Sequence, residues 1–319
     1  MSTPEPHPIE LTRGGAVVAL LGGADGGHGC LGLARCFGPH YTTGELKLVD
    51  AVLAAVDKLL TLTDLHRRGV HQAAVDREHQ LASSLAQAIL PAAAPALAGV
   101  DVFARSVPAK LAGGDFMVFD ILDGVLWFAV GDVAGKGLPA AVVMTMAVSA
   151  ARVAMHRCPD DDPASAVRAV GEDLFDYLSG VGLFVTMALG SYRPGSGIVH
   201  LANAGHSPIV SLAGGQVSTV PPSMPPIGVI RAMKGRTQRV PLTADGLLVL
   251  GSDGLTEQDS DTGVLYGYDR FHRNVAGFSH LPVDEIGEHL FADVNHHAAG
   301  TPAADDRTLV VLREAPPPT

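Results

Sequence analysis

Residues 125–139 read VLWFAVGDVAGKGLP, and the order of residue types in this stretch decides the fold around it. An apolar run, typical of a buried strand, is followed by Asp132 and then by a glycine-rich turn. Glycines beside a lysine suggest a nucleotide-binding loop, but the Walker pattern G-x-x-x-x-G-K-[ST] does not fit the spacing found here. The stretch instead predicts a strand that ends in an acid and turns into a helix, with Pro139 in the first helical turn.

The composition of the 319-residue chain indicates a globular protein with an aliphatic core, since 47% of the residues are hydrophobic and 5% are aromatic. The net charge of −11, without a basic cluster, argues against nucleic-acid binding. Cys30, Cys36 and Cys158 are too scattered for a disulfide framework, so we expect a cytoplasmic protein. The uncharged segment 138–151 is shorter than the roughly 20 residues of a membrane helix, and the N-terminus lacks a secretory pattern, so we expect no membrane association.

The N-terminal third contains a predicted hairpin and two helical patterns. Two apolar runs within 14–36 are separated by glycines, which is typical of a hairpin. A helix follows, capped by Thr42 or Thr43, with apolar residues at alternating spacings of three and four: Leu46, Val49, Leu53, Val56 and Leu60. A second helical pattern runs from Gly69 to Pro91. The stripes within 44–90 either cover the core of their own domain or form the seam of a parallel homodimer.

After residue 98 the chain changes to short apolar runs broken by Gly, Asp and Pro. The strands expected are 100–107, 116–122, 125–131, 184–192, 198–202, 208–212, 246–251 and 308–313, and the helices expected are 138–157, 163–178 and 283–298. Many strands with a few long helices, in no strict alternation, predict an α+β layered fold. We therefore expect a small N-terminal segment (1–68), a helical linker (69–97) and a C-terminal domain (98–315).

Acidic residues recur beside these apolar runs. Asp115 precedes FMVFDIL, Asp132 follows VLWFAV, Asp253 follows LLVLGS, and Asp305 with Asp306 precedes RTLVVL. Each acid alone is typical of a turn or a cap, but four carboxylates that meet at one point would repel one another unless a cation were bound. Oxygen ligands without nearby Cys or His favour Mg²⁺ or Mn²⁺. Two such ions can share an activated water for attack on phosphorus.

The motifs carry a family resemblance. The order ASSLAQAILP, SVPAKLAGGDF, GDVAGKGLPAA, FVTMALG, LANAGHSP, PPIGV, LLVLGSDGLTE, YGYDRF and DDRTLVVL, over about residues 82–313, resembles the SpoIIE/RsbU type of the PPM metal-dependent serine/threonine phosphatases. The resemblance implies an αββα sandwich of two antiparallel sheets flanked by helices, with two Mn²⁺ or Mg²⁺ ions at one end. It also implies dephosphorylation of a phosphoserine on a STAS-type anti-sigma-factor antagonist in a bacterial partner-switching pathway.

The same resemblance implies roles for single residues. Asp115 is expected to bind the second metal, Asp132 to bridge both metals with help from the Val133 carbonyl, and Asp253 and Asp305 to hold the first metal. Asp132 and Asp253 are thus the expected catalytic acids. Supporting or substrate-contacting roles are open for four further residues: Asp306, Lys136, Asn203 and His206.

Some positions depart from the family pattern. Relatives usually have GGDFYDF where this chain has GGDFMVF, and Ala134 stands where many eukaryotic members have a proton-donating histidine. His206 is a candidate proton donor by its chemistry, or else a structural residue. Lys136 either attracts the phosphate or is a solvated loop residue, and Asn203 is expected to organise its turn. Residues 221–240 are expected to form a surface connection, with a partner-docking flap as the alternative.

Two short stretches also resemble parts of other protein families. Residues 29–60 resemble the last strand and helix of a GAF sensor domain, in truncated form. The letters GGDF also occur in diguanylate cyclases, but those enzymes have two acids in the motif and this chain has one. The remaining alternative to a phosphatase is a catalytically silent, metal-free scaffold in the same pathway, which the complete set of four acids disfavours.

Overall fold

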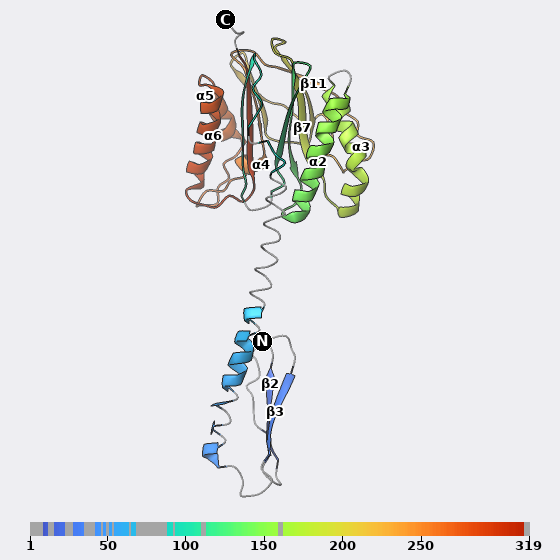
Figure 1. Cartoon of the computed structure of the whole chain (residues 1–319). Coiled ribbons are helices and arrows are strands. Elements are labelled where there is room, and N and C mark those ends of the chain that lie inside the picture. The colour runs from blue at the N-terminus through green and yellow to red at the C-terminus, as the bar shows by residue number, and fades with distance from the viewer. Residues whose placement is uncertain are drawn as a thin grey trace. The chain divides into compact units, whose positions relative to one another are not determined.

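The computed structural model forms two compact units, Met1–Glu78 and His79–Thr319, which are described separately (Figure 1). The division falls inside the linker expected at 69–97, and the exact domain boundaries stay a prediction. The residues that the structure describes are 9–11, 16–22, 28–34, 42–45, 47–48, 51–52, 54–63, 65–67, 88–91, 93–109, 113–158 and 162–315.

The first unit contains a three-stranded antiparallel sheet and a helix. The strands lie in the order β1 (Ile9–Leu11), β2 (Ala16–Gly22) and β3 (His28–Ala34), and the β2–β3 pair is the hairpin predicted from the sequence. The described residues between 43 and 67 are helical. Thr42 and Glu45 exchange hydrogen bonds in a capping box, so the predicted helix start is confirmed. Most of the second predicted helix lies outside the described residues.

The second unit is a sandwich of two five-stranded antiparallel sheets. One sheet has the order β11-β8-β7-β6-β5 and the other has the order β10-β9-β12-β13-β4. The strands are β4 (Val100–Val107), β5 (Phe116–Leu122), β6 (Val125–Val133), β7 (Val185–Tyr192), β8 (Ile198–Ala204), β9 (Ile209–Ala213), β10 (Gln216–Thr219), β11 (Gln238–Pro241), β12 (Leu247–Gly251) and β13 (Arg307–Glu314). The predicted α+β sandwich of antiparallel sheets is therefore confirmed.

Helices cover the outer face of each sheet (Figure 1). The helices are α2 (Leu138–Arg157), α3 (Pro163–Val181), α4 (Asp253–Thr256), α5 (Tyr268–Phe278) and α6 (Val283–Ala298). One core cluster lies between α2, α3 and the β5–β8 sheet, and another lies between α5, α6 and the other sheet. The third cluster fills the space between the sheets, where Phe128 of β6 and Leu250 of β12 are both buried. Burial on both faces explains why the strand sequences are continuous apolar runs rather than alternating patterns.

Helix α2 is long and apolar enough to span a membrane by length and composition. Its buried residues are small or flexible ones, among them Ala140, Ala147 and Met144, and they pack against β5, β6 and α3. Small side chains let a helix approach a sheet closely, so this packing explains the alanine-rich sequence of α2. Among the described residues, this is the single helix with the dimensions of a membrane span, and it serves as a core helix.

The segment 221–240 runs over the surface, as expected, with half of its residues exposed, but some of its apolar residues are buried. Met224, Ile227 and Met233 are buried. Met233 lies against Gly171 of α3, and a Cβ atom on Gly171 would be 2.3 Å from the Met233 sulfur. The prolines and charges of the segment are typical of a loop, and Val229 and Ile230 are exposed, but Met224, Ile227 and Met233 are buried at irregular intervals. The sequence shows no regular period that would mark these three residues as buried.

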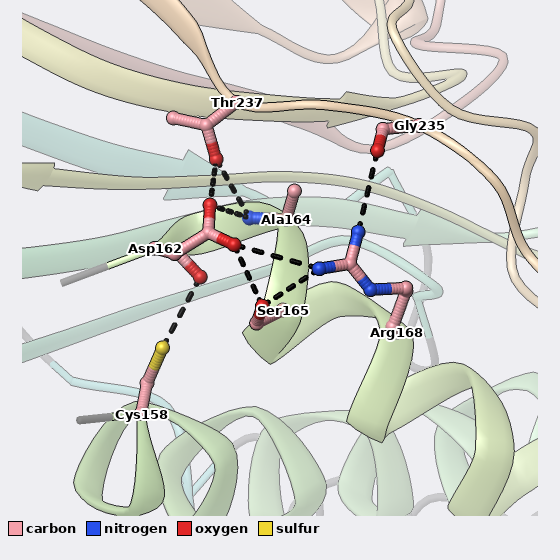
Figure 2. Close-up of polar contacts among 7 residues, drawn as sticks. All are labelled: Cys158, Asp162, Ala164, Ser165, Arg168, Gly235 and Thr237. Atoms are coloured by element: carbon pink, nitrogen blue, oxygen red, sulfur yellow. Dashed lines mark hydrogen bonds and ion pairs between the residues drawn. The ribbon is translucent and has the colours of Figure 1, made fainter. Parts of the chain in front are cut away.

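A polar cluster also ties this segment to the start of α3 (Figure 2). Asp162 caps α3 by accepting hydrogen bonds from the Ala164 amide and the Ser165 hydroxyl, and it also accepts one from the Thr237 hydroxyl. Arg168 donates to the Gly235 carbonyl at 3.3 Å and to Ser165 at 2.7 Å. The chain before β11 is therefore anchored to the helix layer.

Candidate active site

Two antiparallel strand pairs bring the four predicted acids to one end of the sandwich. In one sheet, Phe116 of β5 pairs with Gly131 of β6, so Asp115 and Asp132 are neighbours at the strand ends. In the other sheet, Gly251 of β12 pairs with Leu309 of β13, which places Asp253 beside Asp305. The four acids thus lie at or just beyond the ends of paired core strands.

Hydroxyl groups inside the second sheet hold its end in shape. The Ser252 amide donates to the Thr308 carbonyl at 2.9 Å, and the Ser252 hydroxyl donates to the Asp306 carbonyl at 3.1 Å. The Thr308 amide donates to Ser252 Oγ at 2.9 Å, and Thr308 Oγ1 lies 2.8 Å from Ser106 Oγ of β4. The sequence analysis did not predict these hydrogen bonds, although polar residues beside apolar runs (GSDG and DDRTLVVL) are a signal for them.

Glycines allow the acidic segments to touch. A Cβ atom on Gly114 would lie 2.7 Å from both Asp132 Oδ1 and the Val133 carbonyl oxygen. A Cβ atom on Gly113 would lie 1.5 Å from Asp306 Oδ2. Because any larger residue would push the segments apart, these glycines are required for close approach.

Asp115 is buried and not fully satisfied by the protein. Its Oδ2 atom has no hydrogen-bond partner among the described residues. Burial is the main cause that raises its pKa well above the usual range, and the Asp132 charge adds to it, whereas the hydroxyls of Ser252 and Thr308 lower it. A buried carboxylate oxygen without a partner is costly, so this atom is suited to a cation.

Asp132 and Asp253 are also electrostatically strained. Burial, followed by the charges of Asp253 and Asp305, raises the pKa of Asp132 to about 7. Burial, followed by the Glu257 and Asp305 charges, raises the pKa of Asp253. The pKa values rise because each carboxylate loses water and faces like charges, a situation that a bound cation would reverse.

Asp306 supports the loop that carries Asp115. Its Oδ1 accepts a hydrogen bond from the Ala109 amide at 2.9 Å, and the Asp115 amide also bonds to it. The side chain is 5% exposed. Asp306, directly before β13, therefore holds the loop that contains Gly113, Gly114 and Asp115.

A cavity of about 340 Å³ opens beside the acids. Its lining contains three of the four acids together with the glycine-rich turn and the end of β8. The lining residues are Asp132, Val133, Ala134, Gly135, Lys136, Phe184, Thr186, Gly205, His206, Ser207, Asp253, Glu257, Tyr268 and Asp305. Sequence reasoning did not identify Glu257, Ser207 or Tyr268. The Tyr268 hydroxyl lies 3.0 Å from Ser207 Oγ, which links the YGYDRF and AGHSP motifs at the cavity wall.

His206 and Asn203 form a buried turn at the back of this cavity. The Asn203 side chain accepts a hydrogen bond from the His206 amide at 2.8 Å and donates to the carbonyls of His206 and Val220, so it does organise its turn. His206 Nδ1 lies 3.1 Å from the Thr186 hydroxyl. Burial lowers the pKa of His206 to about 4, against the effect of the Gly251 carbonyl. The imidazole is therefore neutral at pH 7 and has no proton to spare as a general acid.

The residues present fit a hard divalent cation by their chemistry. In the described part of the chain, no three His, Cys, Asp or Glu side chains already form a compact metal shell. The donors at the site are nevertheless all oxygens, one buried carboxylate atom of Asp115 lacks a partner, and the glycine beside it keeps the space around Asp132 and Val133 free of side chains. Mg²⁺ and Mn²⁺ prefer such donors.

Comparisons with known proteins agree with this architecture. The family model described as Stage II sporulation protein E (SpoIIE) matches residues 122–314. The phosphoserine phosphatase RsbU of Bacillus subtilis is 27% identical over 255 residues, which cover 77% of this chain and 72% of that protein. The part of the N-terminus that resembles a GAF domain lies outside the matched family region and gains no support from it.

Solved structures share the fold. The PP2C domain of SiaA from Pseudomonas aeruginosa matches with a TM-score of 0.66 and 22% identity, over 77% of this chain and 99% of that one. The RsbU and RsbW domains of a Mycobacterium tuberculosis protein match with a TM-score of 0.62 and 24% identity, over 72% of this chain and 64% of that one. The chain therefore belongs to the SpoIIE family, and it is a metal-dependent protein phosphatase with the PPM (PP2C) fold.

Proposed function

We propose that the chain hydrolyses a phosphoserine on a protein partner, with two Mn²⁺ or Mg²⁺ ions held at the end of the sandwich. The observation that carries this proposal is the convergence of four acids from two sheets at one end of the sandwich. Three of them line one cavity, and burial and acidic neighbours raise the pKa of Asp132 to about 7. Such an excess of buried negative charge is typical of a cation site.

The proposed ligands are those that the family resemblance implies. Asp253 and Asp305 would hold the first ion and Asp115 the second, and Asp132, with help from the Val133 carbonyl, would contribute to both. Two ions bound there would supply an activated water and would stabilise the negative charge on the phosphoryl group under attack. The RsbU relative, named a phosphoserine phosphatase, supports this chemistry.

The chain's own residues hold these groups in place. Asp306 fixes the loop of Asp115, and the Thr186 hydroxyl donates to the Asp132 carbonyl at 3.3 Å, which steadies the end of β6. His206 is buried and neutral, so in this proposal water in the open cavity protonates the leaving serine. Ala134, which stands where many eukaryotic members have a histidine, cannot donate this proton either.

We further propose a STAS-type anti-sigma-factor antagonist as substrate, in the cytoplasm, and a homodimer formed through the N-terminal helices. A solved relative that combines RsbU and RsbW domains supports a regulatory pathway of this kind. Exposed leucines of the N-terminal helix support dimerisation, since 66% of Leu48, 63% of Leu59 and 58% of Leu65 are accessible.

Asp132→Asn tests the proposed reaction. The variant should lose Mn²⁺-dependent hydrolysis of a phosphorylated STAS protein, and of p-nitrophenyl phosphate, by at least about a hundredfold, because it removes a charge that acts on the transition state. Asp261→Asn, an exposed acid outside the cavity, is the matched control and should keep full activity. Full activity of Asp132→Asn would refute the assignment.

Calorimetry separates the phosphatase from the silent scaffold. The phosphatase should bind Mn²⁺ in the absence of substrate, and Asp132→Asn should weaken that binding. A chain that binds no Mn²⁺ and hydrolyses neither substrate would instead be the scaffold.

A further inference from the structure

Lys136 forms an ion pair with Asp305, one of the acids that the proposed function assigns to a metal ion. Its ammonium lies 2.8 Å from Asp305 Oδ2 and donates to the Ala304 carbonyl at 2.9 Å. The contact links the turn after β6 to the residues before β13, across the two sheets. An ammonium and a divalent cation compete for a single carboxylate oxygen, because both need its lone pairs and its charge.

The lysine is free to move away from this position. Its side chain is 58% exposed, and an exposed ion pair of this kind is weak, worth about 0–1 kcal/mol. Gly135 and Gly137 flank it with φ angles of +116° and +79°, and a Cβ atom on Gly137 would meet nothing within 4 Å. The flexible stem and the open surroundings allow the ammonium to reach other parts of the cavity.

The charges of the cavity give Lys136 a second partner. The described lining contains four acids (Asp132, Asp253, Glu257 and Asp305), and His206 is neutral. Lys136 is the one cationic side chain in that lining. A phosphate monoester that enters would meet mostly negative charge, and the lysine is the group that the protein itself offers to a phosphate oxygen.

We propose that Lys136 is a phosphate-binding residue that stays paired with Asp305 until a metal ion binds. Lys136 leaves Asp305 when that carboxylate binds a divalent cation, and the released ammonium then pairs with the phosphate of the substrate. The exchange makes phosphate binding depend on prior metal binding. This inference rests on the proposed metal role of Asp305.

Lys136→Gln tests both halves of the exchange in the full chain. Calorimetry with Mn²⁺ alone should show binding that is about two- to fivefold tighter than in the wild type, because the competing ammonium is gone. Inhibition by inorganic phosphate, measured with p-nitrophenyl phosphate and Mn²⁺, should weaken by about tenfold, the usual effect of losing a hydrogen bond to a charged group. Lys136→Arg should keep most of the phosphate inhibition because it keeps the charge.

Arg152→Gln is the control for net charge. Arg152 is exposed on the same helix that follows the turn, about 21 Å along α2 from its first residue. This variant should bind Mn²⁺ and inorganic phosphate as the wild type does. A purely structural role for Lys136 would lower the melting temperature without tightening Mn²⁺ binding, and that result would overturn the proposal.

The outcomes also separate this inference from the proposed function. If Lys136→Gln binds Mn²⁺ no more tightly than the wild type, the exchange is wrong even when phosphatase activity is present. If its inhibition by phosphate is unchanged, the phosphate-binding role is wrong. If the wild type hydrolyses neither substrate, the proposed function fails, while the Mn²⁺ titrations still decide whether Lys136 competes for Asp305.

Discussion

Gly254 packs directly against the main chain of Asp306, where a Cβ atom would lie 2.0 Å from the Asp306 carbonyl oxygen. This contact joins the turn after β12 to the start of β13. It therefore sets the distance between Asp253 and Asp305, the two acids proposed for the first metal. The glycine of the SDG motif is explained by a neighbour that is more than 50 positions away in the sequence.

Gly254→Ala should separate these two segments. Overpacking of this kind costs about 1–3 kcal/mol of unfolding free energy, and we expect Mn²⁺-dependent phosphatase activity to fall at least about tenfold. Gly180→Ala is the matched control, because a Cβ atom on this exposed glycine near the end of α3 would meet nothing within 4 Å. Thermal melting and hydrolysis assays measure both effects. Wild-type activity in Gly254→Ala would contradict the role given to this contact.

Asp132→Asn should stabilise the metal-free protein at neutral and alkaline pH. The folded protein keeps the Asp132 proton up to about pH 7, whereas the unfolded chain releases it near 3.8. Between these values the folded state binds more protons, so the free energy of unfolding falls as the pH rises. The variant escapes this loss, which we expect to be on the order of 2 kcal/mol above pH 7 after allowance for partial exposure.

The measurement is the difference in melting temperature between Asp132→Asn and the wild type, in EDTA, from pH 4 to pH 8. The difference should be small at pH 4 and should grow up to about pH 7. The lowered pKa of His206 acts in the opposite sense below pH 6.5, but it is common to both proteins and cancels. Asp261→Asn should show no such trend. If the melting-temperature difference for Asp132→Asn did not change with pH, ionised Asp132 would not destabilise the metal-free protein.

The acids at the strand ends could be predicted because their signals are local. Each acid stands beside an apolar run, and glycines mark the tight turns at Asp115, Asp132 and Asp253. The strand at 116–122 and the helix at 138–157 agree with the structure for the same reason. Composition and spacing predicted neither the pairing of the strands nor the two-sheet sandwich, and the resemblance to a known family supplied only the sandwich.

Other features depend on contacts that leave no local pattern. Asp306 was expected to have a supporting or a substrate-contacting role, and its bond to Ala109 joins residues 197 positions apart. Helix α5 was missed because only Phe271 and Val275 are buried along it. The burial of Met224, Ile227 and Met233 was missed because these side chains follow no period. Such features are fixed by tertiary packing, which single-sequence patterns do not encode.

Asn203→Ala should destabilise the turn behind the cavity. The side chain is fully buried, and its loss leaves the His206 amide and two carbonyls without partners. Unsatisfied buried groups cost about 1–3 kcal/mol each, so we expect a loss of about 2–3 kcal/mol in urea unfolding. Asn295→Ala, which removes an exposed contact to Arg307, should change stability by less than about 0.5 kcal/mol. Equal effects of the two variants would contradict the structural role of Asn203.

Thr237→Val should loosen the segment before β11 from the helix layer. The Thr237 hydroxyl bonds to Asp162, the cap of α3, and it also accepts from the Ala164 amide at 3.0 Å (Figure 2). Valine keeps the shape but removes both bonds, so trypsin should cut faster after Lys234 and Arg236, which are exposed on this segment. Thr262→Val, in an exposed turn, should leave the cleavage rate unchanged. Asp162→Ala should have the larger effect, because it also removes the helix cap, at a cost of about 0.5–2 kcal/mol. If neither variant accelerates cleavage at these two sites, the polar cluster does not anchor the segment, and the buried methionines alone must hold it.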